Sequence, residues 1–268
     1  MLENYIQGKK IIIVGPSPHL IGKQKGSFID SFDTVIRVNE FGITPDLEKD
    51  YGSRTDISFL TLSEEAIQIY LQMKEDVNYD NLKLIVHPRD EYNFNPLTNI
   101  REEINVKEYY KLLNLKVDFY QITEPSFKKR FDIFECFPST GSLAMIEILK
   151  YKFSELYICG FSFYTTKYRY TPKGMEYFRI PKKNQHKHNF RQGGHNTRQE
   201  IKILKKYINK KDNIDGDKLF RKIILSKTNI YYELRRFYIY KINIDNFKNV
   251  LKKTFRKKTY KKLIERYF

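Results

Sequence analysis

One stretch, residues 137–163 (FPSTGSLAMIEILKYKFSELYICGFSF), constrains the fold more than any other part of the chain. Its first half is a turn, Pro138–Gly141, followed by apolar residues at helical spacing. Its second half, Glu155–Gly160, predicts a short buried strand that ends on a glycine, where a backbone passes close to another group. A helix that leads into such a strand is half of a nucleotide-binding α/β unit, and ligands of such sheets lie beyond the carboxyl ends of the strands.

The start of this helix is expected to favour the binding of an anion. Ser139 or Thr140 can act as the N-cap, so the free N–H groups of the first turn are expected to point into one place. The positive end of the helix dipole adds to the attraction for negative charge.

The rest of the chain repeats the alternation of strand and helix. Further strands are predicted at residues 9–15, 32–39, 56–62, 82–87 and 117–122, and helices at 64–74, 102–113 and 197–208. This order predicts an α/β fold built on a mostly parallel sheet. Residues 164–194 form a long polar and aromatic loop, and a loop of that length in a compact domain is either functional or disordered.

Composition narrows the class of protein. The chain has 268 residues, 41% of them hydrophobic, which is enough for one large domain with an appendage. Its two cysteines, Cys136 and Cys159, lie in apolar surroundings and are expected to be reduced core residues of a cytosolic protein. No signal peptide and no apolar run of membrane-spanning length is seen.

The basic charge is concentrated at the C-terminus. Residues 218–268 hold sixteen lysines and arginines against three acidic residues, which is +13 of the net charge of +17. Aromatic residues are interleaved with them, and helical spacing groups Leu263, Ile264, Tyr267 and Phe268. Three interpretations are open: a nucleic-acid-binding segment, a solvated surface, or a helix that lies on anionic lipid.

Three motifs occur in order along the chain. The first comprises VGPSPHL (14–20), IDSFDTVIRVN (29–39) and YGSRTD (51–56); the second is PSTGSLAMIEIL with YICGF (138–161); the third is His195 followed five residues later by Glu200. Their order and spacing resemble the long, short and very short sialylmotifs of the animal-type sialyltransferases, glycosyltransferase family 29, and the related bacterial family 42. The resemblance covers roughly residues 10–205, and three ordered motifs are far more specific than one.

The resemblance implies a single Rossmann-like domain, a variant of the GT-A arrangement. It implies an inverting glycosyltransferase that takes a sugar from a CMP donor and needs no metal or other cofactor. We therefore expect residues 1–212 to form the catalytic domain and residues 213–268 to form a basic helical appendage.

The resemblance also assigns roles to particular residues. His195 matches the general base, and a neutral imidazole suits proton removal from an acceptor hydroxyl. Tyr164 and Tyr170 match in spacing the two tyrosines that hold the leaving phosphate in family 42. The substrate-binding set implied by the motifs and the loop that follows them comprises Gly15, Ser17, Asn39, Thr61, Ser139, Thr140, Gly141, Gly160, Phe161 and His188.

Two residues depart from the family pattern. Pro16 replaces an asparagine after the first glycine, and Thr61 stands where family 42 has an asparagine on the donor sugar. The CMP class is kept, but the sugar is open: sialic acid is favoured, with Kdo, another 2-keto acid sugar, as the alternative.

Asp215-Gly216-Asp217 spells the Asp-x-Asp of metal-dependent glycosyltransferases. Because it opens the basic segment, a turn with an N-cap is the favoured interpretation, and no metal site is predicted.

The function expected from the sequence is transfer of a 2-keto acid sugar to a hydroxyl of a bacterial surface glycan, such as lipopolysaccharide or capsule. Since that acceptor is lipid-borne, the appendage is expected to hold the enzyme peripherally on the inner face of the cytoplasmic membrane. A non-catalytic, nucleic-acid-binding α/β protein is the competing class.

Overall fold

The computed structural model describes residues 1–39, 43–62, 70–71, 79–89, 92–95, 100–103, 106–122, 132–134, 136, 138–165, 196–229 and 231–232. The chain divides into two compact units, Met1–Ser226 and Lys227–Phe268. The first unit carries the sheet. The predicted helical appendage beyond residue 232 lies outside the described residues, so that prediction stays a prediction.

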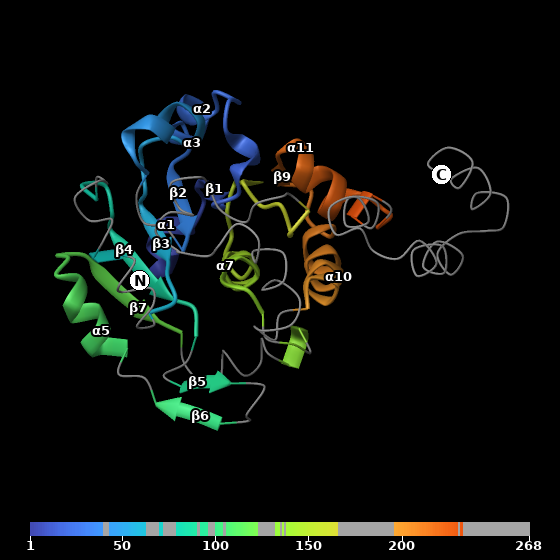
Figure 1. The fold of residues 1–268 in the computed structure, drawn as a ribbon. Coiled ribbons are helices and arrows are strands. Elements are labelled where there is room, and N and C mark those ends of the chain that lie inside the picture. Colours follow the sequence, from blue (N-terminus) through green and yellow to red (C-terminus); the bar gives the residue numbers. More distant parts are fainter. Residues whose placement is uncertain are drawn as a thin grey trace, which may run out of the picture. The chain divides into compact units, whose positions relative to one another are not determined.

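The first unit is built on seven parallel strands in the order β7-β4-β3-β2-β1-β8-β9 (Figure 1). The strands are β1 (Lys10–Val14), β2 (Thr34–Val38), β3 (Ile57–Phe59), β4 (Leu84–His87), β7 (Asp118–Gln121), β8 (Glu155–Cys159) and β9 (Ile214–Gly216). The predicted α/β class with a mostly parallel sheet is confirmed, and each predicted strand segment contains one of the first six strands. The edge strand β9 comes from residues that the sequence analysis assigns to the appendage.

The helices of the described part surround this sheet. They include α1 (Leu2–Ile6), α2 (Gly26–Asp30), α3 (Glu48–Tyr51), α5 (Val106–Leu113), α7 (Thr140–Ile148), α10 (Thr197–Ile208) and α11 (Lys218–Phe220). Two short 3₁₀ helices, η1 (Pro18–Leu20) and η2 (Pro45–Leu47), and a π-helix, η3 (Arg221–Leu225), join them. The helices predicted after residue 138 and at 197–208 are confirmed as α7 and α10. The helix predicted over 64–74 lies mostly outside the described residues.

The helix predicted from residue 102 is wrong at its start. Residues Ile100–Glu103 form strand β6, which pairs antiparallel with β5 (Tyr92–Asn95), and α5 begins only at Val106. Glu102 and Glu103 are good helix formers, but pairing with the neighbouring strand decides their conformation.

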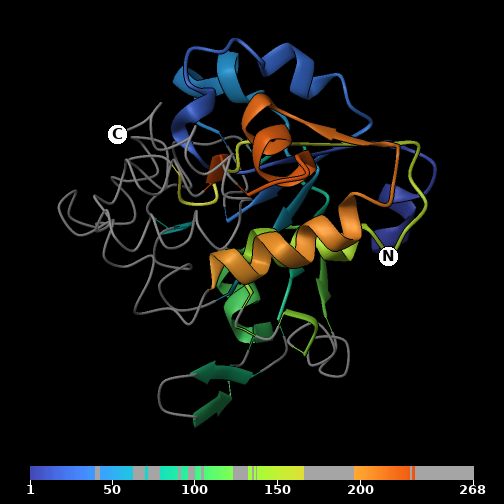
Figure 2. The same ribbon diagram turned by 90° about the vertical axis from the view of Figure 1, so that its right-hand side faces the viewer.

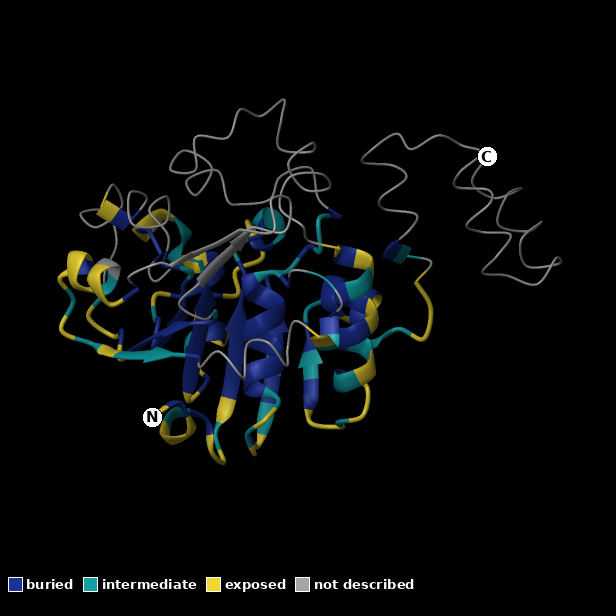
Figure 3. Cartoon of the chain, turned by 90° about the horizontal axis from the view of Figure 1, so that it is seen from below, coloured by how far each residue is buried: buried dark blue, intermediate teal, exposed yellow. Residues whose placement is uncertain are grey.

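The central strands are buried on both faces. Ile12 and Val14 of β1 join Val35 of β2 and Ile29 of α2 in one apolar cluster. Ile11 and Ile13 alternate with Ile12 and Val14 along β1, and Ile36 follows Val35 in β2. Because side chains alternate along a strand, these three isoleucines point to the opposite face, and they are also fully buried. Figure 3 shows the central strands and α7 in the colour of buried residues. This burial explains the continuous apolar runs of the sequence.

Helix α7 is enclosed on all sides. Each of its residues from Thr140 to Ile148 is buried, and it packs against β2, β3 and α10. Figures 1 and 2 both show α10 lying beside α7. Ile201, Leu204 and Ile208 of α10 are buried, as the helical spacing predicts. The packing holds the start of α7 at the carboxyl edge of the sheet.

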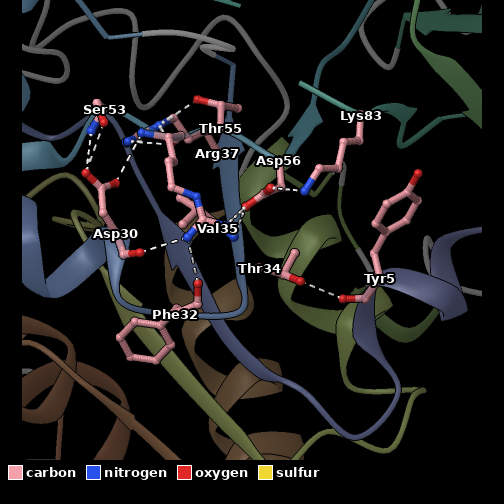
Figure 4. Close-up of polar contacts among 11 residues, drawn as sticks. Tyr5, Asp30, Phe32, Thr34, Val35, Arg37, Ser53, Thr55, Asp56 and Lys83 are labelled. Carbon is pink, nitrogen blue, oxygen red and sulfur yellow. Dashed lines mark hydrogen bonds and ion pairs between the residues drawn. The ribbon is translucent and has the colours of Figure 1, made fainter. Parts of the chain in front are cut away.

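A buried arginine organises the segment between β2 and β3. Arg37 is 2% exposed, and its guanidinium donates hydrogen bonds to Thr55 Oγ1 and to the carbonyl oxygens of Tyr51, Gly52 and Arg54, at 2.8–3.1 Å. Figure 4 shows Arg37 beside Thr55 in this network. Arg37 thus fixes the turn at Gly52, which has a φ of 74°.

Two carboxylates complete the network (Figure 4). Asp56 accepts hydrogen bonds from the backbone N–H of Val35 at 2.9 Å, from Arg54 at 2.9 Å and from Lys83 at 2.7 Å. Asp30 accepts from the N–H groups of Ser53 and Arg54, at 2.9 and 3.1 Å. The contacts seen for these residues of the first motif, Asp30, Arg37 and residues 52–56, are therefore contacts that hold the fold together.

Replacing Arg37 with methionine tests this role. The Arg37→Met variant loses hydrogen bonds to several carbonyl oxygens and should lower the free energy of unfolding by about 3–5 kcal/mol. Arg221→Met is the matched control, since Arg221 pairs with Asp215 at the surface, with its side chain 57% exposed, and should change stability by less than about 1 kcal/mol. Denaturant unfolding of both variants measures the difference. Equal stabilities would contradict the structural role of Arg37.

Candidate active site

The sheet has a topological switch point between β1 and β8. From β1 the chain continues to β2 on one side, whereas β8 pairs with β1 on the other side. Ligands of open α/β sheets bind beyond the carboxyl ends of the strands at such a point. Gly15 follows β1 and Gly160 follows β8, so the sequence places a glycine on each side of the switch point.

The two glycines let the backbones touch. A Cβ atom added to Gly15 would lie 2.5 Å from the Gly160 carbonyl oxygen, and one added to Gly160 would lie 2.3 Å from that of Gly15. Gly160 also has a φ of 75°, which favours glycine. The N–H of Ser17 donates to the Gly160 carbonyl at 3.0 Å, which fixes the loop after β1 against the end of β8.

The ring of Phe161 fills the space beside both β1 and α7. Its edge lies 2.9 Å from a Cβ placed on Gly15 and 2.7 Å from one placed on Gly141. Gly141 is in the first turn of α7, so Phe161 joins that turn to the end of β1. The structure shows a packing role for Phe161; its predicted substrate contact stays a prediction.

Of the two predicted candidates for the N-cap of α7, Ser139 and Thr140, Ser139 takes the role. Its side-chain oxygen accepts from the N–H of Ser142 at 3.3 Å. Thr140 Oγ1 lies 3.0 Å from Thr61 Oγ1, so the hydroxyl that follows β3 contacts the start of the helix. The described part of the chain supplies no acceptor for the N–H groups of Thr140 and Gly141. These two donors lie at the carboxyl edge of the sheet.

An internal anion already lies at this helix start. Glu200 of α10 is 3% exposed, and its Oε2 accepts hydrogen bonds from the N–H and Oγ of Ser139, at 3.2 and 2.6 Å, and from the hydroxyl of Ser142. Its Oε1 is buried with no partner among the described residues. The Glu200 carboxylate therefore ties the third motif to the second, and the predicted binding of a ligand anion at this helix start stays a prediction.

Asn39 has an uncommon backbone conformation at the end of β2. Its φ is 61°, and its N–H donates to the carbonyl oxygen of Phe59 at 3.0 Å. A non-glycine residue in the left-handed region is held there by its surroundings, and such residues cluster at functional sites. The nucleotide contact that the motif assigns to Asn39 stays a prediction.

Tyr164 is likewise held in a strained turn. Phe163 and Tyr164 have φ values of 47° and 58°, and Thr165 closes the turn by donating its N–H to the Ser162 carbonyl at 2.8 Å. Bulky side chains rarely adopt this region, at a cost of about 1–3 kcal/mol each. The turn follows Phe161 directly and keeps Tyr164 at the carboxyl edge of the sheet.

Three predicted site residues, His195, Tyr170 and His188, lie outside the described residues. Asn196, directly after His195, is described: its side chain caps α10 by accepting from the N–H of Gln199 at 3.2 Å. Because Glu200 binds the start of α7, the first turn of α10 lies beside that helix.

Several residues that shape this region have no local signature in the sequence. Arg37 and Glu200 lie within the motifs, but nothing in the neighbouring residues indicates that both side chains are buried. His19 and Asp217 lie 2.9 Å apart but are separated by 198 positions in the chain, so no local pattern joins them. The predicted N-cap role of Asp217 is confirmed, because it accepts from the N–H groups of Leu219 and Phe220. The predicted turn is wrong, because Ile214–Gly216 form strand β9 beside β8.

Neither a metal cluster nor a membrane span is found in the described ranges. No group of three or more histidine, cysteine, aspartate or glutamate side chains is arranged to hold a metal ion within them. None of the helices described there has the length and apolar character needed to cross a bilayer.

Solved structures with a similar fold include sialyltransferases. A mammalian sialyltransferase in complex with Gal-beta-1-3GalNAc-ortho-nitrophenol is 19% identical, with 79% of this chain and 70% of that chain covered and a TM-score of 0.45. Another structure of a mammalian sialyltransferase is 20% identical, with 79% and 69% covered and a TM-score of 0.45. No curated protein sequence matches the chain.

A protein-family model matches most of the unit Met1–Ser226 that carries the sheet. The model of glycosyltransferase family 29 (sialyltransferase) matches residues 6–212, which include all three motifs and the whole carboxyl edge described above apart from Asp217. The chain therefore belongs to glycosyltransferase family 29, the sialyltransferase family.

Proposed function

We propose that this glycosyltransferase moves sialic acid from a CMP donor to a hydroxyl of a bacterial surface glycan, without a metal ion. One observation carries the donor assignment: Phe161 joins the loop after β1 to the first turn of α7 at the switch point. The N–H groups of Thr140 and Gly141 are thereby held beside that loop, where an anionic carboxylate or phosphate would be met by the helix start.

The donor is also recognised through the neighbouring strand ends. Asn39 follows β2 in a strained conformation suited to a fixed contact with the nucleotide. Thr61 follows β3, and its hydroxyl contacts Thr140 at 3.0 Å, so it is near the helix start that would hold the sugar carboxylate. Sialic acid and Kdo both carry such a carboxylate, and Kdo is the alternative donor.

The reaction proposed is a direct displacement. The acceptor hydroxyl attacks the anomeric carbon while the bond to the phosphate oxygen breaks, CMP leaves, and the configuration inverts. His195 takes the proton of the hydroxyl, while Tyr164 and Tyr170 donate hydrogen bonds to the departing phosphate. His188, from the same loop, is proposed as a further contact to the substrate.

Metal independence is part of the same proposal. Asp215 pairs with Arg221. Asp217 accepts from backbone N–H groups of Gly160, Leu219 and Phe220. Both carboxylates of the Asp-x-Asp sequence thus have protein partners, which supports a leaving group stabilised by hydrogen bonds rather than by a divalent ion.

The proposed acceptor glycan and the proposed location of the enzyme are both argued from the charge distribution along the chain. The sixteen basic residues of 218–268 would attract the enzyme to anionic lipid, where a lipid-borne glycan is made. We propose a peripheral position on the inner face of the cytoplasmic membrane. Family membership makes the chain an enzyme, so a non-catalytic nucleic-acid-binding protein is set aside.

Donor class is tested by binding. Purified protein should bind CMP with a dissociation constant of about 1 μM to 1 mM, with UDP weaker, and the affinity should be unchanged by a chelator. Calorimetry measures all three quantities. Loss of CMP binding with the chelator, or a preference for UDP, would contradict the proposal.

The base is tested by comparing turnover with binding. His195→Ala should lower kcat by about 10²–10⁴-fold, because proton removal is lost, while CMP affinity stays within about threefold. Tyr164→Phe should lower kcat less, since it removes one hydrogen bond of several to the phosphate. Near-normal turnover of His195→Ala would remove it from the mechanism.

Membrane association is tested by truncation. Deletion of residues 233–268 keeps Tyr232, which is 1% exposed, and removes twelve basic residues. The truncated enzyme should no longer sediment with anionic vesicles at low salt, since each basic residue near the surface contributes about 1 kcal/mol, while transfer to a soluble acceptor continues. Equal sedimentation of both forms would show that the segment does not anchor the enzyme to the membrane. Binding of the full-length enzyme to duplex DNA but not to vesicles would also contradict the proposed membrane association.

A further inference from the structure

Asp217 connects three parts of the carboxyl edge. It follows β9 and caps α11, with Oδ1 accepting from the N–H groups of Leu219 and Phe220 at 2.9 and 2.8 Å. Its other oxygen, Oδ2, accepts from the N–H of Gly160 at 2.9 Å. The carboxylate thus reaches the switch point from a residue beyond the segment that the family model covers.

His19 extends this connection to the loop after β1. Its Nε2 lies 2.9 Å from Asp217 Oδ2, and its Nδ1 lies 3.1 Å from Ser17 Oγ. The three side chains are largely buried: Ser17 is 3% exposed, and the side chains of His19 and Asp217 are 18% and 14% exposed. They form a continuous chain of hydrogen bonds from α11 to the loop of the first motif.

The loop itself is held rigidly. The Ser17 N–H donates to the Gly160 carbonyl at 3.0 Å, and Tyr51 donates its hydroxyl to the Ser17 carbonyl at 2.6 Å. With its backbone fixed on both sides, Ser17 has little freedom except rotation of its hydroxyl. The partner of that hydroxyl therefore depends on His19.

Asp217 sets the tautomer of His19. Burial acts to raise the pKa of the Asp217 carboxyl, but the hydrogen bond and charge of His19, with backbone N–H groups of Phe220 and Gly160, bring the pKa below its ordinary value. Asp217 is thus a carboxylate at neutral pH and can only accept. His19 must carry a proton on Nε2, which leaves Nδ1 to decide the direction of the hydrogen bond with Ser17.

The protonation state of His19 therefore controls what Ser17 offers to a ligand. When the imidazole is neutral, Nδ1 accepts the Ser17 hydroxyl proton, and Ser17 can only accept from a ligand. When the imidazole is protonated, Nδ1 donates to Ser17 Oγ, and the Ser17 hydroxyl is released to donate to an anion. The second state also places a positive charge near the switch point.

We propose that Asp217 and His19 form a relay that turns the Ser17 hydroxyl toward the phosphate of the bound donor, with His19 taking up a proton as the phosphate binds. The inference rests on the proposed function, because it assumes that a CMP phosphate occupies the switch point. In it, His19 and Asp217 are positioning residues that act through Ser17, and Asp217 sustains the charge that His19 acquires.

Few other groups near this relay titrate around neutral pH. On β8, burial raises the pKa of Tyr157 to about 12 and raises the pKa of the Cys159 thiol far above its ordinary value, so both stay neutral. Arg221 is paired with Asp215. Burial acts to raise the pKa of the Asp215 carboxyl, but the hydrogen bond from Arg221 brings that pKa below its ordinary value. Lys25 and Arg37 also act on Cys159, and both carry basic side chains. Of these kinds of side chain, an imidazole is the one that ordinarily changes charge near neutral pH, so the proton uptake is assigned to His19 as part of the proposal.

The test measures protons taken up on binding. The probe is the 5′-phosphate methyl ester of CMP, because a phosphodiester, unlike free CMP with its second ionisation near pH 6, does not titrate in this range. Calorimetry in buffers of different ionisation enthalpy at pH 7 should show uptake on the order of half a proton per ester bound. Affinity should strengthen as the pH falls from 8 to 6, since binding takes up a proton.

Three variants separate the relay from a structural effect. His19→Asn should abolish the uptake and flatten the pH dependence. Asp217→Asn keeps the oxygen that caps α11, since asparagine caps helices as well as aspartate does, but its amide nitrogen cannot accept from Gly160 and His19 as Oδ2 does. Folded Asp217→Asn should lower the uptake by at least half. His195→Ala should keep the uptake, which excludes the proposed base as its source.

The outcomes are distinguishable. No binding of either CMP or the ester would contradict the proposed function together with the relay. Binding with no proton uptake, or uptake unchanged in folded His19→Asn, would overturn the relay alone and leave the proposed function in place. Nitrogen chemical shifts of the His19 ring should also move from those of the Nε2–H tautomer to those of the imidazolium when the ester is added; unchanged shifts would overturn it.

Discussion

The structure depends on the close approach of two backbones, those of Gly15 and Gly160, at the carboxyl ends of β1 and β8. A single Cβ at either position would lie within 2.5 Å of the other's carbonyl oxygen, so the approach requires both glycines. This approach brings the ends of β1 and β8 together at the switch point. It also lets the ring of Phe161 lie against both Gly15 and Gly141. The start of α7 is thereby fixed beside the loop after β1, where the phosphate or carboxylate of the donor is proposed to bind.

The three motifs of the sequence are three parts of one structure. Arg37, Asp30 and Asp56 of the first motif hold the chain between β2 and β3, so that Asn39 ends β2 in a fixed conformation. The second motif supplies α7, β8 and the glycine contact. Glu200 of the third motif is hydrogen-bonded to Ser139 of the second, so the chain that carries His195 is joined to the helix start. Many motif residues therefore act by supporting the site rather than by touching a ligand.

The strands and the two long helices of the sheet domain could be predicted because their patterns are local. Continuous apolar runs such as residues 10–14 form buried parallel strands, and the spacing of Ile201, Leu204 and Ile208 predicts one face of α10. The β5–β6 pair was missed because Glu102 and Glu103 favour a helix and only their partner strand overrides that preference. Strand β9 could not be predicted because three residues are too few to show a period, and its pairing with β8 is a contact between distant segments.

The site was predicted in the same uneven way. Glycines and the Ser139 cap have local signatures, and the structure places them together. The pairs Glu200–Ser139 and His19–Asp217 join residues 61 and 198 positions apart, so only the folded chain reveals them. The buried carboxylate of Glu200 beside the start of α7 had no local signature in the sequence, because its partner Ser139 lies in another motif.

The account is tested most directly by a crystal structure of the enzyme with CMP bound. It predicts the nucleotide at the carboxyl ends of β1, β2 and β8, with its phosphate between the Gly15–Ser17 loop and the N–H groups of Thr140 and Gly141. CMP bound at the opposite edge of the sheet, or with its phosphate remote from the start of α7, would contradict it.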